Sequence, residues 1–443
     1  MNIQSGGVEI YPCGNSCGIP GHDPSALQRT ADSYFVTLVS GSGGGDAFGM
    51  RYLDPSNYTA GWMFGEYSYL QPEWVEDWLY PNGCDGKACP FWAPDLVTSG
   101  NGISPGDDNF IMYYSIADYN TYGRACIGRA KGSFNPSTSP PSIDWEDSGA
   151  PVVCSNVTQV SLGGPHAIDP SVSVDEEGRW WLSMGSWSDQ AHVGPKGGGV
   201  WVVELDSNSG MLGPQARAQC SESQQFGNSN HNYPSPFCWS LDNTGFKNIA
   251  NNPCVAGSGQ CPSVYDDSNS IEASYLYRRT YRSQRELSQT LNYYYLFINY
   301  YYCCRGSEST YEIHVGRSTT GPAGPFLDRN GRDLQTGGGT LLLSLSHTSS
   351  GEILAGPGHA GILELQTNSF KIHDNSSEFP ERPGQDRDLL NKSSHAHKEE
   401  YTYVFTFDYQ GVGEDIEYAP QCRELSWDEQ GWPVIGNQAW FPI

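Results

Sequence analysis

Three carboxylates stand in similar short motifs that lie far apart in the chain. They are Asp23 in His-Asp-Pro-Ser, Asp169 in Ile-Asp-Pro-Ser and Glu272 in Ile-Glu-Ala-Ser. Hydrolysis of a glycosidic bond needs a carboxylic acid that protonates the leaving oxygen and a carboxylate that activates water or attacks the sugar. Three carboxylates in one site cannot all ionise at their ordinary pKa values, so one stays protonated. We predict that Glu272 is the acid, Asp23 the base, and Asp169 the group that tunes and orients the acid.

Two further motifs complete a set of five, which we call the openings. They are Trp92-Ala93-Pro94-Asp95 and Gly356-Pro357-Gly358-His359. Each opening precedes an aromatic-rich run with β character, and a third strand follows; the runs are 34–39, 110–116, 179–184, 293–302 and 401–407. A repeat of roughly 70 to 100 residues with a few antiparallel strands is typical of a β-propeller blade. The sequence therefore predicts an all-β, five-bladed β-propeller whose openings occupy equivalent positions and meet at the central axis.

The whole chain is predicted to form a single catalytic domain. Its 52 Gly, 27 Tyr and 13 Trp suit short strands and many turns, and no long helical periodicity competes. A Cys-rich insertion around 219–267 exceeds what a blade needs, and long loops on a rigid scaffold often carry specificity. The predicted domain covers 1–443, with blades at approximately 18–90, 91–164, 165–268, 269–354 and 355–443.

The charge of the chain narrows the class of partner. A net charge of −26 and a pI near 4.6 argue against nucleic acid or an anionic membrane, because a polyanion would be repelled. No stretch reaches transmembrane length. A neutral polysaccharide remains compatible as substrate. A monomer is the default expectation for a closed propeller.

The thirteen cysteines indicate an oxidising compartment. Several have short spacing, and no paired Cys-x-x-Cys knuckles are present, so we expect disulfides rather than a zinc site. The odd number leaves at least one thiol free. Residues 1–8 have neither a basic segment nor an apolar one, so secretion would require a signal peptide absent from this sequence or another export route. We predict a secreted, extracellular protein.

The motifs together resemble glycoside hydrolase family 43, and within it most closely the endo-α-1,5-L-arabinanases. The openings occur in order over nearly the whole chain. The most specific part is Cys303-Cys304-Arg305-Gly306, followed by Ser309-Thr310-Tyr311 and Val315-Gly316-Arg317-Ser318. The resemblance implies a five-bladed propeller that hydrolyses arabinan with inversion, again with Asp23 as base, Glu272 as acid and Asp169 as pKa modulator. Inversion predicts a base-to-acid separation of roughly 6.5 to 9.5 Å.

The same resemblance places His359 near a cation on the propeller axis. It implies calcium or another cation, held mainly by water because hard cations prefer oxygen and one imidazole is a poor calcium site. No organic cofactor is expected. The alternative for a lone His after Pro-Gly is a structural role.

Three residues are candidates for substrate binding. Trp92 opens the second blade, Trp187 follows the second strand of the third blade, and His166 precedes the Asp169 motif. An aromatic face is a natural platform for a sugar ring. Packing between blades is the alternative, and it has equal weight for Trp187. Arabinanases often carry asparagine at the position of His166, so the role of His166 here stays open.

Two other functions remain compatible with these motifs. Family 43 also contains exo-acting α-L-arabinofuranosidases and β-xylosidases with the same three carboxylates. If the 219–267 insertion closes one end of the cleft, short products are expected; an open groove favours internal cleavage. From another class, a non-catalytic carbohydrate-binding propeller is the alternative.

The sequence departs from the family beside the predicted acid. Ala273-Ser274 stands where Ala-Pro is more common in the family, and this difference would loosen the strand next to Glu272.

Overall fold

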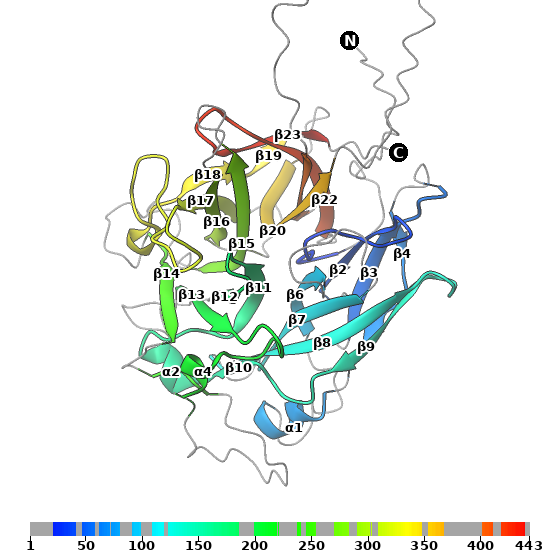
Figure 1. The fold of residues 1–443 in the computed structure, drawn as a ribbon, viewed down its shortest axis with the longest axis horizontal. Helices are drawn as coiled ribbons and strands as arrows, with labels where there is room; N and C mark the ends of the chain where they lie inside the picture. The colour runs from blue at the N-terminus through cyan, green and yellow to red at the C-terminus, as the bar shows by residue number, and fades with distance from the viewer. Residues whose placement is uncertain are drawn as a thin grey trace, which may run out of the picture.

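The computed structural model of the chain is built almost wholly of short β-strands around one axis (Figure 1). The residues that the structure describes are 21–40, 47–57, 62–70, 72–79, 91–98, 109–118, 123–185, 199–218, 220, 237–240, 245–253, 270–282, 290–301, 303, 309–347, 353–366, 401–410 and 418–438. Every statement of structure below concerns these residues.

The strands of the described residues form five antiparallel sheets that follow one another in chain order. The first sheet contains β1 (Gln28–Arg29), β2 (Phe35–Val39), β3 (Ala47–Leu53), β4 (Met63–Phe64) and β5 (Ser68–Tyr69). The second contains β6 (Phe91–Thr98), β7 (Asn109–Ala117), β8 (Ala125–Asn135), β9 (Ser142–Asp147) and β10 (Val153–Ser155). The third contains β11 (Ile168–Val174), β12 (Trp180–Gly185), β13 (Val200–Leu205) and β14 (Phe246–Ala250). The fourth contains β15 (Ile271–Arg282), β16 (Thr290–Tyr300), β17 (Glu312–Ser318) and β18 (Thr340–Leu343). The fifth contains β19 (Ser346–His347), β20 (Ile353–Gln366), β21 (Tyr401–Gln410), β22 (Tyr418–Trp427) and β23 (Pro433–Gln438).

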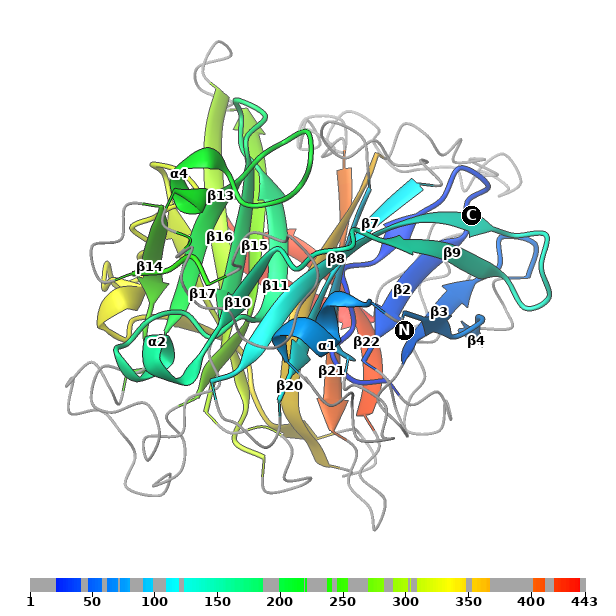
Figure 2. The ribbon, with the colours of Figure 1, turned by 90° about the horizontal axis from the view of Figure 1, so that it is seen from below.

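Helices are short and lie outside the sheets (Figure 2). They are α1 (Trp74–Trp78), α2 (Val157–Ser161), α4 (Pro214–Arg217) and the 3-10 helix η4 (Leu334–Thr336). The N-terminus of helix α2 is capped by Asn156, whose side chain accepts a hydrogen bond from the Gln159 N–H. Within the described ranges, no helix has the length and apolar character needed to cross a membrane.

The sheets are arranged as the blades of a propeller, with β6, β11, β15 and β20 on the side facing the axis (Figure 1). The prediction of an all-β, five-bladed β-propeller is confirmed. The blade bounds and the single domain over 1–443 stay predictions, because strand pairing locates the sheets and not the limits of a domain.

Apolar clusters fill the spaces between consecutive sheets. In β7, Phe110, Met112 and Tyr114 pack toward the first sheet. The alternate residues Ile111 and Tyr113 pack toward the third. Because successive side chains of a strand point to opposite faces, a strand between two blades must be apolar on both. This explains the aromatic-rich runs that mark the blades in the sequence.

Closure of the ring between the fifth and first sheets has two distinctive features. Neither sheet contains a described strand from the other end of the chain. The apolar cluster between them is also smaller, among the described residues, than the clusters at the other four joints. Its buried members are Leu27, Phe35, Leu53, Leu363, Leu365, Val404 and Cys422. We therefore expect the last joint to depend more on polar contacts than the others do.

Two disulfides have both partners in the described part of the chain, and Cys303 is disulfide-bonded as well, as the cysteine content predicted. Cys126 is bonded to Cys154, which ties β8 to β10, and Cys220 is bonded to Cys238 within the predicted insertion. Cys422 is a free, buried thiol. The close pairs Cys13/Cys17, Cys84/Cys89 and Cys254/Cys261, and most of the 219–267 insertion, lie outside the described residues.

Candidate active site

The openings of four sheets contain the same β-bulge. The strand register shifts between Trp92 and Asp95, Ile168 and Ser171, Glu272 and Tyr275, and Gly358 and Gly361. Inside each bulge, and at the matching point of the first sheet, one residue has a left-handed φ between 43° and 52°: Asp23, Ala93, Asp169, Ala273 and His359. This conformation costs about 1 kcal/mol for a residue other than glycine. Bulges commonly redirect side chains beside active sites.

The five openings meet at one pocket, as predicted. Its lining includes one or more residues from every opening: Pro24, Ala93, Asp169, Ala273 and His359. Residues separated by more than 330 positions in the sequence are therefore neighbours in space.

The position of Glu272 corrects one detail of the sequence interpretation. Asp23 and Asp169 occupy the left-handed position of their bulges, but in the fourth sheet that position belongs to Ala273. Glu272 lies one residue earlier, where it pairs with Asn299. Its equivalents are His22, Trp92, Ile168 and Gly358. The three carboxylates thus extend from two different backbone positions, and only Asp23 and Asp169 are structurally equivalent. Of the three, Asp169 lines the pocket, and the charges of Asp169 and Asp23 both act on Glu272. We call these three carboxyls and their surroundings the pit.

Asp23 is surrounded by hydrogen-bond donors. Its Oδ2 lies 2.9 Å from His22 Nδ1 and accepts the Ser40 hydroxyl at 2.6 Å. Its Oδ1 lies 2.8 Å from His359 Nδ1. Burial alone would raise the pKa of Asp23, but the two histidines lower that pKa well below its ordinary value. Asp23 is an ionised carboxylate, which is the state that a general base needs.

Asp169 connects the third and fourth blades. Its Oδ2 accepts the Ala273 N–H at 2.8 Å, directly beside Glu272. Burial raises the pKa of Asp169, His359 lowers it, and Asp23 raises it further. The carboxyl of Asp169 is therefore fixed against the strand that carries Glu272.

Glu272 has a different environment. Its Oε1 accepts the Tyr311 hydroxyl at 2.9 Å. Burial, reinforced by the negative charge of Asp169, raises the pKa of Glu272 to about 8, and the Tyr311 hydrogen bond opposes that rise. Glu272 is therefore protonated at neutral pH, which is the state that a general acid needs.

A ring of hydrogen bonds joins consecutive blades at the bulges. The N–H of the left-handed residue donates to a side chain of the preceding blade: Ala93 to Ser40 at 2.8 Å, Asp169 to Ser115 at 2.9 Å, and Asp23 to Asp408 at 3.0 Å. Ser40, Ser115 and Asp408 occupy equivalent positions on the second strands. At the third blade this position is Gly185, and there Asp169 itself accepts the Ala273 N–H.

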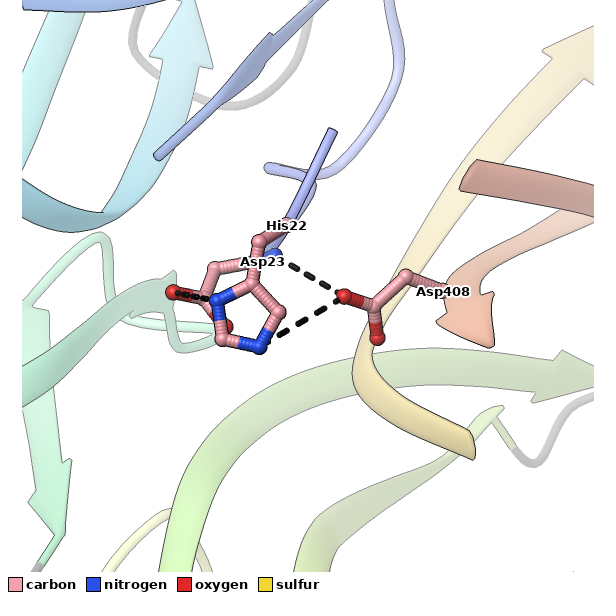
Figure 3. Close-up of side chains that lie close together, drawn as sticks. All are labelled: His22, Asp23 and Asp408. Atoms are coloured by element: carbon pink, nitrogen blue, oxygen red, sulfur yellow. Dashed lines mark hydrogen bonds and ion pairs between the residues drawn. The ribbon is translucent and has the colours of Figure 1, made fainter. Parts of the chain in front are cut away.

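The last blade meets the first at His22, Asp23 and Asp408 (Figure 3). Asp408, on β21, accepts the Asp23 N–H with Oδ2 and lies 3.9 Å from His22 Nε2. Burial raises the pKa of Asp408 to about 6, and His22 lowers it. These three residues also have ligand atoms close enough together to hold a metal ion. Since Asp23 and His22 already contact each other, the same arrangement serves as a hydrogen-bonded joint.

The surroundings of His359 are compatible with a metal ligand, and the cation that the resemblance implies stays a prediction. Its Nδ1 contacts Asp23, and its buried Nε2 has no hydrogen-bond partner, lying 3.9 Å from Asp169 Oδ1. A histidine that ligates a metal usually donates its other ring N–H to a carboxylate or carbonyl. Burial alone would lower the pKa of His359, but Asp23 and Asp169 raise it to about 10. A cation at Nε2 would therefore replace a proton.

The candidate substrate residues have different surroundings. Trp92 is partly buried and packs against Ala117, Ala125 and Ile168, so its ring contributes to blade packing and also keeps an exposed part. His166 is 2% exposed. Trp187 lies outside the described residues. Binding of substrate by these residues stays a prediction.

Sequence reasoning missed several residues that shape the site. His22 and Tyr311 stand inside motifs that were noted, but neither was given a role. Ser40, Ser115 and Asp408 gave no signal, because a polar residue near the end of an apolar strand has no distinctive spacing. Aligning the ends of the second strands across the five repeats would have been needed to find them.

A five-bladed propeller that holds one protonated and one ionised carboxyl in a common pit has the arrangement of a glycoside hydrolase. No family model matches the chain. It is 28% identical over 329 residues to an extracellular exo-α-(1→5)-L-arabinofuranosidase of Cellvibrio japonicus, covering 73% of this chain and 70% of that one. It is 25% identical over 360 residues to an extracellular endo-α-(1→5)-L-arabinanase of Bacillus subtilis, covering 80% and 81%.

Among solved structures, the chain is similar to a family 43 endo-arabinanase from Bacillus licheniformis. The TM-score is 0.57 and the identity is 22%, with coverage of 94% of this chain and 97% of that one. At this identity the likeness concerns the fold. Together with the sequence relatives, it confirms the predicted resemblance to the arabinanases of glycoside hydrolase family 43.

Proposed function

We propose that the protein hydrolyses α-1,5-linked L-arabinan of plant cell walls, with inversion. One observation carries the proposal: two carboxyls in one pit have their pKa values shifted in opposite directions, Glu272 upward to about 8 and Asp23 downward. Such a pair supplies an acid and a base at the same pH. The substrate is inferred from the relatives, one named as an endo-α-(1→5)-L-arabinanase and the other as an exo-α-(1→5)-L-arabinofuranosidase.

The reaction follows from these protonation states. Asp23 removes a proton from water as the water attacks the anomeric carbon. Glu272 gives its proton to the glycosidic oxygen as the bond to that oxygen breaks. In its ionised form Asp169 raises the pKa of Glu272, which helps to keep the proton on Glu272 until transfer. The two protons are then exchanged with solvent, which restores the starting state.

The test of this proposal is Glu272→Gln assayed on debranched linear arabinan. We expect kcat to fall by about 10²–10⁴-fold, the contribution of a positioned general acid. A circular dichroism spectrum and melting temperature like those of the wild type would show that the fold is retained. Normal activity of this variant would refute the acid assignment.

Exo action is the second candidate, because one relative is named as an exo-acting arabinofuranosidase. Sizing the products from linear arabinan separates the two. A ladder of short arabino-oligosaccharides indicates internal cleavage, whereas a single short product from the start of the reaction indicates exo action. An aryl β-xyloside assayed in parallel tests the xylosidase alternative. If both substrates bind without turnover, the protein is a carbohydrate-binding propeller instead.

A cation at His359 is the second part of the proposal. The imidazole Nε2 would be its protein ligand, with water completing the shell of calcium. The positive charge would favour the ionised forms of Asp23 and Asp169. Addition of calcium to chelator-treated protein should raise the melting temperature, because a ligand that binds only the folded state stabilises it. His359→Ala should abolish that rise; an equal rise in both proteins would place the ion elsewhere.

The remaining proposals concern substrate contacts and cellular setting. Trp92 is proposed to support a sugar ring, with Trp187 and His166 as further contacts, so Trp92→Ala should raise KM more than it lowers kcat.

Secretion is proposed from the disulfides and from the two relatives named extracellular. A monomer is proposed, and light scattering at assay concentration tests it.

A further inference from the structure

Tyr311 stands beside the proposed acid in a restricted position. It directly precedes β17, is 4% exposed, and donates its hydroxyl to Glu272 Oε1 at 2.9 Å. Its ring fits because the facing residue of the fifth blade is Gly358, where a Cβ atom would lie 2.6 Å from Cε1 of the tyrosine. Burial and the charge of Glu272 raise the pKa of Tyr311 well above its ordinary value, so the hydroxyl remains a donor.

We propose that Tyr311 is the positioning residue of the general acid. Its hydroxyl engages Oε1 of Glu272, so the proton that leaves is carried by Oε2. This inference rests on the proposed function, in which Glu272 is the acid. During the reaction the proton moves from Oε2 to the glycosidic oxygen, and the bond from that oxygen to the anomeric carbon breaks. The hydrogen bond from Tyr311 then stabilises the carboxylate that remains.

A second tyrosine of the same blade provides a structural comparison. Tyr277, on β15, donates its hydroxyl to Glu364 Oε2 at 2.8 Å and is 6% exposed. It lies in the apolar cluster between the fourth and fifth blades. Both tyrosines thus make a partly buried hydrogen bond from a hydroxyl to a carboxyl oxygen. They differ in that the carboxyl at Tyr311 is the proposed proton donor, so only Tyr311 should affect proton transfer.

The experiment compares Tyr311→Phe with Tyr277→Phe on aryl α-1,5-L-arabinotriosides. One substrate carries phenol as the leaving group, which needs a proton, and the other carries 2,4-dinitrophenol, which leaves as a stable anion. For Tyr311→Phe we expect kcat on the phenyl substrate and on linear arabinan to fall about 10- to 100-fold, part of the 10²–10⁴-fold that a general acid supplies. The dinitrophenyl substrate should change less than about threefold on the same reasoning. KM should stay near that of the wild type.

The pH profile gives an independent measurement. The Tyr311 hydrogen bond favours the ionised form of Glu272, so its loss should shift the alkaline limb of kcat to higher pH. Tyr277→Phe should leave both the limb and the leaving-group pattern unchanged. If Tyr311→Phe does not fold, Gly358→Ala provides a second variant that retains the hydroxyl but crowds the ring, with a Cβ 2.6 Å from the ring and 3.1 Å from Asp408 Oδ1. Because the ring contact is the closer one, the loss on the phenyl substrate should exceed the loss on the dinitrophenyl substrate.

The proposal is overturned if Tyr311→Phe slows both aryl substrates equally, or if it behaves like Tyr277→Phe. Failure of the proposed function has a different result, because the wild-type protein would then turn over neither arabinan nor the aryl arabinotriosides. Failure of the acid assignment alone would leave Glu272→Gln active on arabinan. If Glu272→Gln shows leaving-group dependence and Tyr311→Phe does not, only the role of Tyr311 is refuted.

Discussion

On the two sides of the pit, the pKa values of the carboxyls are shifted in opposite directions. On the first blade, Asp23 contacts two imidazoles and a serine hydroxyl, and its pKa falls. On the fourth blade, Glu272 receives one hydrogen bond from Tyr311 and has the negative Asp169 nearby, and its pKa rises. The repeat supplies similar backbone positions around the axis, but the second strands and neighbouring blades supply different partners.

This difference shows where the division of roles comes from. Both carboxyls are removed from solvent, and burial alone would raise both pKa values. The sign of the net shift is decided by the partners: cationic or hydrogen-bonding groups at Asp23, and a like charge at Glu272. In the proposed mechanism the neighbours therefore decide which carboxyl is the base and which is the acid, and changing a neighbour should weaken one role without affecting the other.

The largest effect expected is that of Asp23→Asn. This variant removes the base, so kcat should fall by about 10²–10⁴-fold. Because attack by water is needed for every substrate, the loss should be similar for phenyl and dinitrophenyl arabinotriosides. Glu272→Gln should instead spare the dinitrophenyl substrate. Steady-state kinetics of both variants on both substrates make the comparison, and similar patterns for the two variants would contradict the assigned roles.

The alkaline limb of the pH profile should report Glu272. An acid with a raised pKa carries its proton at neutral pH and loses it as pH rises through about 8. Activity on arabinan should therefore decline above that pH while the protein remains folded. The dinitrophenyl substrate, which needs no proton, should show a weaker decline. A limb of equal steepness on both substrates would mean that another group is titrating.

The fold was predictable because its signal is distributed over the whole chain. Each blade between two neighbours needs strands that are apolar on both faces, and strands such as β7 record this in their sequence. The Asp and Glu motifs also predicted where the pit lies. Five similar openings, one at the start of each repeat, have few explanations other than a shared site at the axis. The disulfides followed from composition, but their pairing did not.

The exact position of the acid could not be predicted. A one-residue offset between Glu272 and the two aspartates depends on which residue takes the left-handed conformation, and Ala273 gives no sign of it in the sequence. Asp408 was equally hidden, because it reaches Asp23 from a strand 385 residues later. Contacts across the closure of a ring leave no local pattern.

A smaller effect is expected at the closure between the last and first blades. Asp408→Ala removes the acceptor of the Asp23 N–H and the partner of His22, and a hydrogen bond to a charged group contributes about 1.5–3 kcal/mol. The melting temperature should fall, and kcat should fall with it because the base is less firmly held. Asp408→Asn keeps an acceptor oxygen and should retain more of both.

Ser115→Ala is the matched control for this joint. It removes the acceptor of the Asp169 N–H, which is the equivalent hydrogen bond between the second and third blades. Those two blades are also connected directly by the polypeptide chain. Thermal unfolding of the variants gives the comparison. If Ser115→Ala and Asp408→Ala destabilise equally, the last joint has no special dependence on its polar contacts.

The smallest effect should come from Gly185, which lies opposite Ile168 and beside the acid. A Cβ at this position would stand 3.1 Å from Glu272 Cα, so Gly185→Ala should displace the strand by a few tenths of an ångström. Since 1 Å of misplacement can cost about 10²-fold, we expect kcat to fall about two- to fivefold. Gly436→Ala, with its closest contact at 3.3 Å to Glu424 Cβ in the fifth blade, is the matched control. A loss on arabinan that exceeds the loss on the dinitrophenyl substrate would place the effect on the acid side. An equal loss on both would mean that the base side responds as well, and that the two halves of the pit are mechanically coupled.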